Sequence, residues 1–157
     1  MQTKTDPDAL GQIEPAFHKS EWPYYWITRV NARYVLAVEK ALRPIGLDVP
    51  RWRVLSSLTE DAYLSISEIS DFCIIRLNTT TKIIQRMTTD GLVTVRSRKA
   101  DARVTEVTLT EEGRAQARRA RVLVEAVFQR SFADIGSEEL AQMNSLLKRV
   151  FDRLGEG

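Results

Sequence analysis

Hydrophobic residues recur at intervals of three and four along most of the chain, which is the period of an amphipathic helix. The first such pattern runs from Pro23 to Arg43, where Pro44 prevents the helix from continuing. A second helix is expected to begin at Pro50, because the first turn of a helix tolerates a residue without an N–H. Its predicted inward positions are Trp52, Val54, Leu55 and Leu58.

Two shorter helices are expected next. Ser65 and Glu68 have the spacing of a capping box, in which each side chain accepts a hydrogen bond from a free backbone N–H of the other. They predict a helix at about 65–74. After a brief turn, a fourth helix is predicted over 77–90 and ends at Gly91. Its predicted inward positions are Ile83, Ile84 and Met87.

The period of the pattern then changes from that of a helix to that of a strand. Segments 92–96 and 104–109 are rich in β-branched residues and predict two short strands, joined by the charged loop 97–103. A helix capped by Thr110 follows and reaches about Asp134, and a last amphipathic helix completes the chain. The predicted fold is mainly α with a small β-hairpin, in the order α-α-α-α-β-β-α-α.

Composition excludes several classes of protein. The chain has 157 residues, enough for one ordinary domain, and it contains no run of 18 apolar residues that would predict a membrane span. Its N-terminus does not resemble a signal peptide, so a cytoplasmic protein is expected. With His18 and Cys73 as the single histidine and cysteine, neither a disulfide nor a His/Cys metal cluster is expected. No nucleotide-binding or nucleophile motif appears, so neither an enzyme nor a cofactor is predicted.

Positive charge is concentrated in one stretch of the sequence. The formal charge of the whole chain is +2, but segment 76–103 contains seven basic residues and two acidic ones, a balance of +5. The remainder of the chain therefore carries −3. Such a distribution favours a surface that binds nucleic-acid phosphates.

Two short helices, a tight turn and a following β-hairpin make a winged helix-turn-helix. In such units the second helix enters the major groove of DNA, while the wing reaches an adjacent minor groove or the backbone. Asn and Gln can pair with adenine, Thr can contact a thymine methyl group, and Lys or Arg can hold phosphates. A solvated polar helix face is the alternative explanation. The outward face of helix 77–90 is predicted to present Asn78, Thr79, Thr80, Thr81, Lys82, Gln85 and Arg86.

The hairpin loop carries a second candidate contact. Arg103 lies at the loop end, where an arginine can enter a narrow minor groove, and Asp101 is positioned to orient its guanidinium. No other acidic residue lies in the loop 97–103. Taken alone, this pair is equally explained as an exposed turn with a local ion pair. The wing residues expected at DNA are Arg96, Arg98, Lys99, Asp101 and Arg103.

The run LVTVRSRKADARVTEVTLTEEG, residues 92–113, resembles the wing of the MarR family of bacterial regulators. It has that family's Leu-Val start, Asp-x-Arg tip and Leu-Thr-x-x-Gly exit, and the resemblance covers about 22–154. It implies a homodimeric repressor that binds a palindromic operator and is released by a ligand, with Arg103 in the minor groove and Asp101 supporting it. Leu77 departs from the family pattern, which often has a polar residue there, so base preference is not transferred. The positions matched to major-groove contacts are Asn78, Thr79, Thr81 and Lys82.

The last helix carries an apolar stripe that a single winged helix does not need. Such a stripe usually packs against a partner, and the alternative is packing onto the helix at 110–134. The expected organisation is a flexible arm at 1–20, dimerisation helices at 21–48 and 110–157, and a DNA-binding lobe at 49–109. The stripe consists of Leu146, Leu147, Val150, Phe151 and Leu154.

Four of the five residues in 22–26 are aromatic. In relatives that respond to aromatic acids, the effector lies between the dimerisation helices and the DNA-binding lobe. Rings would supply a flat apolar pocket and an arginine would pair with a carboxylate, so an aromatic carboxylate such as a phenolic or indole acid is predicted. Each ring taken singly is better explained as a core or interface residue, whereas the cluster as a whole favours a pocket. The predicted ligand-binding residues are Trp22, Tyr25, Trp26, Thr28, Asn31, Tyr34 and Arg53.

Two other functions stay open at this point. Cys73 would allow a redox-responsive regulator of the same fold, although its place on the inward side of the third predicted helix favours a structural role. A winged helix that binds protein rather than DNA is the second alternative, and it would have no need for the basic wing.

Overall fold

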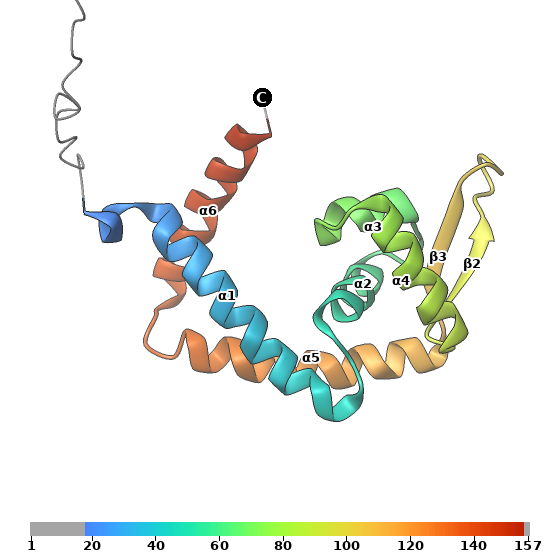
Figure 1. Ribbon diagram of the computed structural model, residues 1–157, viewed down its shortest axis with the longest axis horizontal. Coiled ribbons are helices and arrows are strands. Elements are labelled where there is room, and N and C mark those ends of the chain that lie inside the picture. The colour runs from blue at the N-terminus through green and yellow to red at the C-terminus, as the bar shows by residue number, and fades with distance from the viewer. Residues whose placement is uncertain (1–17, 156–157) are drawn as a thin grey trace, which may run out of the picture. The chain divides into compact units, whose positions relative to one another are not determined.

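The computed structural model of the chain describes residues 18–155 (Figure 1). The chain divides into two compact units, Met1–Leu36 and Ala37–Gly157. The first contains a short 3-10 turn and most of helix α1, Pro23–Leu42. The second contains the end of α1, a 3-10 turn at Arg43–Ile45, and the remaining elements: α2 (Val49–Glu60), β1 (Leu64–Ser65), α3 (Ile66–Cys73), α4 (Leu77–Thr89), β2 (Val93–Ser97), β3 (Thr105–Leu109), α5 (Glu111–Ser131) and α6 (Ser137–Leu154).

All the predicted helices and both predicted strands are present, with ends that differ by a few residues. Helix α2 begins at Val49, one residue before the expected Pro50, because the Asp48 carboxylate accepts a hydrogen bond from the Arg51 N–H at 2.9 Å. Of the predicted flexible arm at 1–20, residues 1–17 lie outside the described part of the chain. Within 18–155, no helix is long and apolar enough to span a membrane.

The predicted caps of α3 and α5 are confirmed. The Ser65 hydroxyl accepts from the Glu68 N–H at 3.1 Å, and the Glu68 carboxylate accepts from the Ser65 N–H at 2.6 Å. At the start of α5, the Thr110 hydroxyl accepts from the Gly113 N–H at 2.9 Å. These side chains satisfy N–H groups that a helix cannot pair internally, so they fix where each helix begins.

The sheet has three strands rather than the predicted two. Its order is β1-β3-β2, all antiparallel, with Leu64 opposite Val107 and Val93 opposite Leu109. The predicted hairpin of β2 and β3 is confirmed, and β1 adds a third strand that the sequence did not predict. Strand β1 has only two residues, too few to show a period of two in the sequence. It joins the base of the hairpin to the helix pair α3 and α4.

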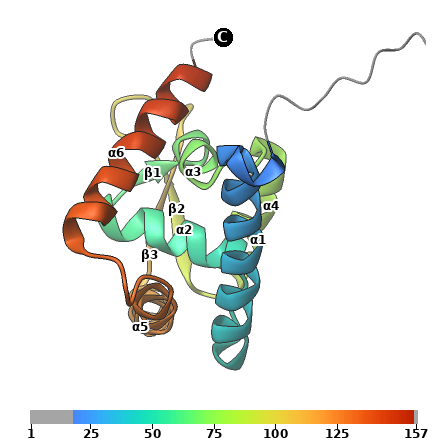
Figure 2. The ribbon, with the colours of Figure 1, turned by 90° about the vertical axis from the view of Figure 1, so that its left-hand side faces the viewer.

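The core of the second unit lies between its helices and the inner face of this sheet. Val54 and Leu55 of α2, Ile69 of α3, Met87 of α4 and Val107 of β3 are fully buried. Helix α2 lies beside α5 in both views (Figures 1 and 2). Two residues predicted to point inward, Trp52 and Ile83, are only half-buried.

The turn between α3 and α4 contains a strained residue. Ile74 ends α3 in the left-handed region, with φ at 52°, and its side chain is 78% exposed. The Ser70 hydroxyl donates to the Ile75 carbonyl oxygen and holds this turn. A β-branched residue with positive φ is costly, so packing and hydrogen bonds around it must impose the conformation that sets α3 against α4.

Candidate nucleic-acid interface

Helix α4 has one polar face and one buried face. Ile84 and Met87 pack into the core. Opposite them, residues spaced by three and four leave the surface polar and basic, as a helix that enters a groove requires. The exposed side chains of this face are Asn78, Thr79, Lys82, Gln85 and Arg86.

Thr80 was expected on that face and is instead part of the core. Its side chain is completely buried, and its hydroxyl donates to the Arg76 carbonyl oxygen at 3.1 Å. The prediction was wrong because Thr80 precedes Ile84 by four residues and so shares the inward face of the helix. Thr81 is half-buried, and its hydroxyl donates a hydrogen bond to the Leu77 carbonyl oxygen at 2.9 Å.

The N-terminal end of α4 is exposed and electropositive. Among the described residues, no side chain caps the helix at Arg76, so the first N–H groups are available to an anion. The helix dipole adds partial positive charge at the same end. Leu77, the departure from the family pattern, is 54% exposed there.

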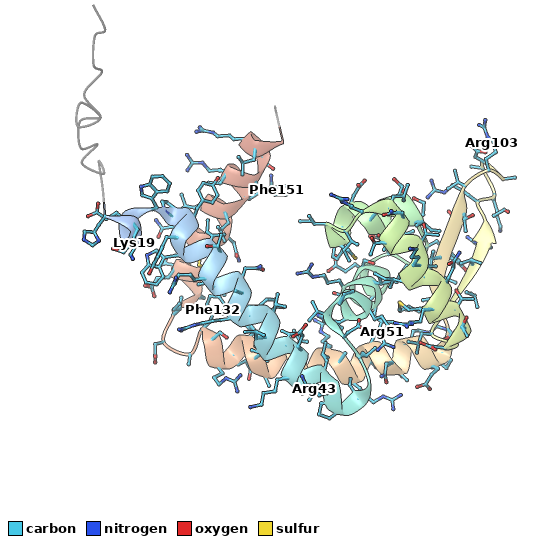
Figure 3. The ribbon with its side chains drawn as sticks, in the orientation of Figure 1. Lys19, Arg43, Arg51, Arg103, Phe132 and Phe151 are labelled. Atoms are coloured by element: carbon cyan, nitrogen blue, oxygen red, sulfur yellow. The ribbon has the colours of Figure 1, made fainter. Side chains whose placement is uncertain are left out.

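The tip of the wing presents one ordered cation. The Arg103 guanidinium donates twice to the Asp101 carboxylate, from Nε at 3.0 Å and from Nη2 at 3.1 Å, while its side chain is 90% exposed. The Asp101 carboxylate also accepts from the Arg103 backbone N–H at 3.1 Å. These bonds lower the pKa of Asp101, which stays ionised at neutral pH. Arg103 projects from the end of the β2–β3 hairpin (Figure 3).

The two arginines nearer the base of the wing are engaged within the protein. Glu106 accepts from Arg96 Nε at 3.1 Å and from Arg98 Nε at 2.7 Å. Glu68 accepts from Arg98 Nη2 at 2.9 Å. The loop 97–103 contains no further acid, as expected, but the hairpin brings a carboxylate from β3 and another from α3 to these cations. Both carboxylates lie outside the segment whose charge was counted.

The aromatic segment of the first unit is held by contacts within α1 and with the 3-10 turn before it. The Tyr25 and Trp26 rings meet edge to face at 5.0 Å, and the Arg29 guanidinium lies 4.7 Å from the centre of the Tyr25 ring. The Trp26 indole N–H donates to the Ser20 carbonyl oxygen at 2.8 Å. Trp22 and Trp26 are both 54% exposed. These rings are therefore accessible within the described structure.

The other predicted ligand-binding residues differ in their surroundings. Asn31 and Tyr34 are exposed on α1, and the Thr28 hydroxyl is committed to the Tyr24 carbonyl oxygen at 2.8 Å. Arg53 belongs to the second unit, where it is half-buried and its Nη1 lies 3.4 Å from the Cys73 carbonyl oxygen.

The chain is similar in sequence and in fold to known DNA-binding proteins. Residues 47–94 match the family model described as winged helix-turn-helix DNA-binding. The chain is 44% identical over 138 residues to the HTH-type transcriptional repressor IacR of Pseudomonas putida, which covers 88% of this chain and 83% of the relative. A structure of MarR from Escherichia coli, a Cys-to-Ser mutant in complex with operator DNA, aligns with a TM-score of 0.71 at 25% identity, covering 79% of this chain and 89% of that one.

The chain belongs to the MarR family of transcriptional regulators. This MarR-family chain is therefore a DNA-binding regulator and not an enzyme, and its fold is the predicted winged helix-turn-helix. BpsR of Bordetella bronchiseptica, whose structure is described with regulation of DNA binding by 6-hydroxynicotinic acid, aligns with a TM-score of 0.76 at 25% identity. That alignment covers 87% of this chain and 97% of BpsR.

Among residues 18–155 of this MarR-family chain, no cluster of three or more His, Cys, Asp or Glu could hold a metal ion.

Glu106 is the residue of the wing that the sequence did not single out. Alternation along β3 places Glu106 on the face opposite the core residues Val107 and Leu109, so the signal that could have pointed to it is its cross-strand pairing with Arg96.

Cys73 is expected to be unreactive in the native protein. Its side chain is 2% exposed, and burial raises the pKa of the thiol to about 11, although the nearby Arg53 charge opposes the shift. At neutral pH fewer than about one thiol in a thousand is then a thiolate, the nucleophilic form. Iodoacetamide should label the denatured chain at Cys73 and leave the folded chain unlabelled, as mass spectrometry would show. Rapid labelling of the folded protein would restore the redox alternative.

Proposed function

We propose that this MarR-family chain is a repressor that binds a palindromic DNA operator as a homodimer in the bacterial cytoplasm and is released by an aromatic carboxylate, a phenolic or indole acid. Two features together carry the proposal that the chain binds DNA. The first is the exposed polar face of α4, and the second is the exposed Arg103 at the wing tip, whose guanidinium is oriented by the Asp101 carboxylate.

The two elements would contact different parts of the duplex. Asn78 and Thr79, in the first turn of α4, have the short polar side chains that let a helix approach base edges in the major groove. Lys82 and Arg86 lie on the same exposed face and would hold phosphates. In the wing, Arg103 would enter the minor groove, with Lys99 contacting the backbone. The operator-bound MarR of Escherichia coli supports this assignment by its likeness.

Dimerisation is supported by the surface of α6. Within the described structure no residue of this helix is buried. The alternative from the sequence is that α5 covers the apolar stripe of α6, but the stripe residues are exposed. A second copy would bury that stripe, and its two-fold symmetry would match an inverted repeat in DNA. The stripe residues are Leu146, Leu147, Val150, Phe151 and Leu154, which are 40% to 68% exposed.

The effector class is supported by the aromatic segment. Trp22, Tyr25 and Trp26 supply aromatic rings, and Arg29, whose guanidinium lies over the Tyr25 ring, is a cation of the same segment that a carboxylate could pair with. BpsR, a structural relative, is regulated by 6-hydroxynicotinic acid, itself an aromatic carboxylate.

Binding to the DNA beside the chain's own gene tests the repressor function. A mobility-shift titration at several salt concentrations should show a complex whose affinity falls steeply with salt, because lysines and arginines replace counterions on phosphates. Sedimentation should give two chains per duplex. A protein that binds no duplex at low salt would instead be the protein-interaction module considered above.

Titration with aromatic acids tests the effector. Phenolic carboxylates should quench the tryptophan fluorescence and dissociate the operator complex, and indole carboxylates should raise the melting temperature because binding favours the folded state. The matched carboxamides serve as controls, since they keep the ring and lose the charge. If acids and amides behave alike, or neither has an effect, the carboxylate assignment is wrong.

A further inference from the structure

Glu106 is a buried carboxylate in the middle of the wing. It lies on β3 directly opposite Arg96 of β2, and it is only 7% exposed. Both of its oxygens are used: Oε1 accepts from Arg98 and Oε2 from Arg96. Hydrogen bonds between ionised partners are the strong ones, and a buried carboxylate left unpaired is costly, so this arrangement resists being broken.

The contacts continue from the wing to the helix-turn-helix. Arg98 also donates to Glu68 Oε2 at 2.9 Å, and the same oxygen accepts from the Ser65 N–H at the start of α3. Beside this chain of contacts, the Arg96 guanidinium lies 3.5 Å from the centre of the Tyr63 ring, just before β1. The base of the wing is thus connected to the first turn of α3 through charged side chains as well as through the sheet.

These pairs change which cations are available to DNA. Glu106 and Glu68 neutralise the charge of Arg96 and Arg98, so the base of the wing carries no net charge. Both carboxylates have a lowered pKa, Glu106 chiefly through its hydrogen bond from Arg98 and Glu68 chiefly through the Ser65 N–H. A lowered pKa keeps a carboxylate ionised at neutral pH, and the pairing is lost only as the solution becomes acidic. The exposed cations that remain near the tip are Lys99 and Arg103.

We propose that Glu106 is a positioning residue that withholds Arg96 and Arg98 from DNA phosphates and holds the wing against α3, so that the wing contacts DNA through its tip alone. The inference rests on the proposed DNA-binding function. Phosphate contacts give affinity without sequence information, whereas a wing held at one angle can place Arg103 in one groove position. Glu106 therefore favours the operator over other DNA.

A Glu106→Gln variant tests this proposal. The probes are a random-sequence duplex and an operator duplex selected by the wild-type protein from a random pool. Freeing two arginines should make the plot of log affinity against log salt steeper by about 1 to 2 on the random duplex, since each phosphate contact contributes about 0.9. The preference for the operator over the random duplex should fall by about 10-fold, the loss of one specific contact.

A second variant keeps the test valid if Glu106→Gln does not fold. Glu68→Gln retains the capping box, because glutamine can also accept from the Ser65 N–H, and it removes only the outer partner of Arg98. On the random duplex, the plot of log affinity against log salt for Glu68→Gln should steepen by about half as much as the plot for Glu106→Gln. In a triple variant, Glu106→Gln with Arg96→Gln and Arg98→Gln, the salt dependence should return to that of the wild type.

The matched control is Glu112→Gln on α5. It removes one negative charge and frees one arginine, because Glu112 pairs with Arg119 at 2.7 Å outside the wing. Its salt dependence should equal that of the wild type. Wild-type protein that binds neither duplex would refute the proposed function. Wild-type binding with no steepening in the two wing variants, or with equal steepening in the control, would overturn the role of Glu106.

Discussion

An Arg103→Ala variant is expected to fold normally and to bind operator DNA about 10- to 100-fold more weakly than the wild type, the range typical for loss of one specific arginine contact. The side chain is 90% exposed, and within residues 18–155 its guanidinium hydrogen-bonds to Asp101, two residues away. Its removal therefore leaves the core intact. The loss should appear in a fluorescence-anisotropy titration, while the melting temperature and the oligomeric state stay unchanged.

Arg119→Ala is the matched control for this substitution. Arg119 is also an exposed arginine paired with an exposed carboxylate, but it lies on α5. Its loss should leave operator affinity close to that of the wild type. Asp101→Asn should give a smaller loss than Arg103→Ala, because the guanidinium remains and only its orientation is relaxed. Equal operator affinity for the wild type and Arg103→Ala would remove Arg103 from the interface.

A Gly113→Ala variant is expected to be strongly destabilised. Gly113 is buried in the first turn of α5, and a methyl group built on it would overlap the Leu92 carbonyl oxygen and come within 3.3 Å of Leu109 Cδ2. The Leu92 oxygen cannot withdraw freely, because it accepts the Thr110 N–H at 3.0 Å. Overpacking against backbone costs more than against a flexible side chain, so about 3 kcal/mol or more of unfolding free energy should be lost.

Chemical denaturation followed by circular dichroism measures this loss, and Gly155→Ala is its control. Gly155 ends α6 in the right-handed region, and a methyl group there would meet only ordinary contacts, the nearest being the Asp152 carbonyl oxygen at 3.5 Å. The control should unfold at the denaturant concentration of the wild type. A Gly113→Ala protein as stable as the wild type would show that α5 can shift away from the sheet.

Much of the fold could be predicted because its signals are local. The Ser65–Glu68 capping box and the Thr110 cap join residues three apart, and helix α1 ends at Leu42, two residues before Pro44. The Asp101–Arg103 pair spans two residues, so its geometry was also predictable from the turn. Each of these features depends on a few neighbouring residues whose conformations are restricted in the same way wherever they occur.

The prediction of DNA contacts was less complete, for reasons that particular residues show. Thr80 was grouped with its exposed neighbours because it has their chemistry, whereas the helical period places it with Ile84 in the core. Arg96 and Arg98 were grouped with Arg103 as wing cations, yet carboxylates from β3 and α3 engage them. Residue type indicated what these side chains could bind, but not what they bind within the protein.

The order of the helices and of the two hairpin strands, the caps, and the charged wing with its Asp-x-Arg tip could be inferred from residues close together in the chain. The third strand, β1, and the neutral base of the wing depend instead on contacts between distant segments. Glu68 and Arg98 are thirty residues apart, and Arg96 meets Glu106 because of one strand register. Such pairs form only when packing brings distant segments together, and no local pattern records that packing.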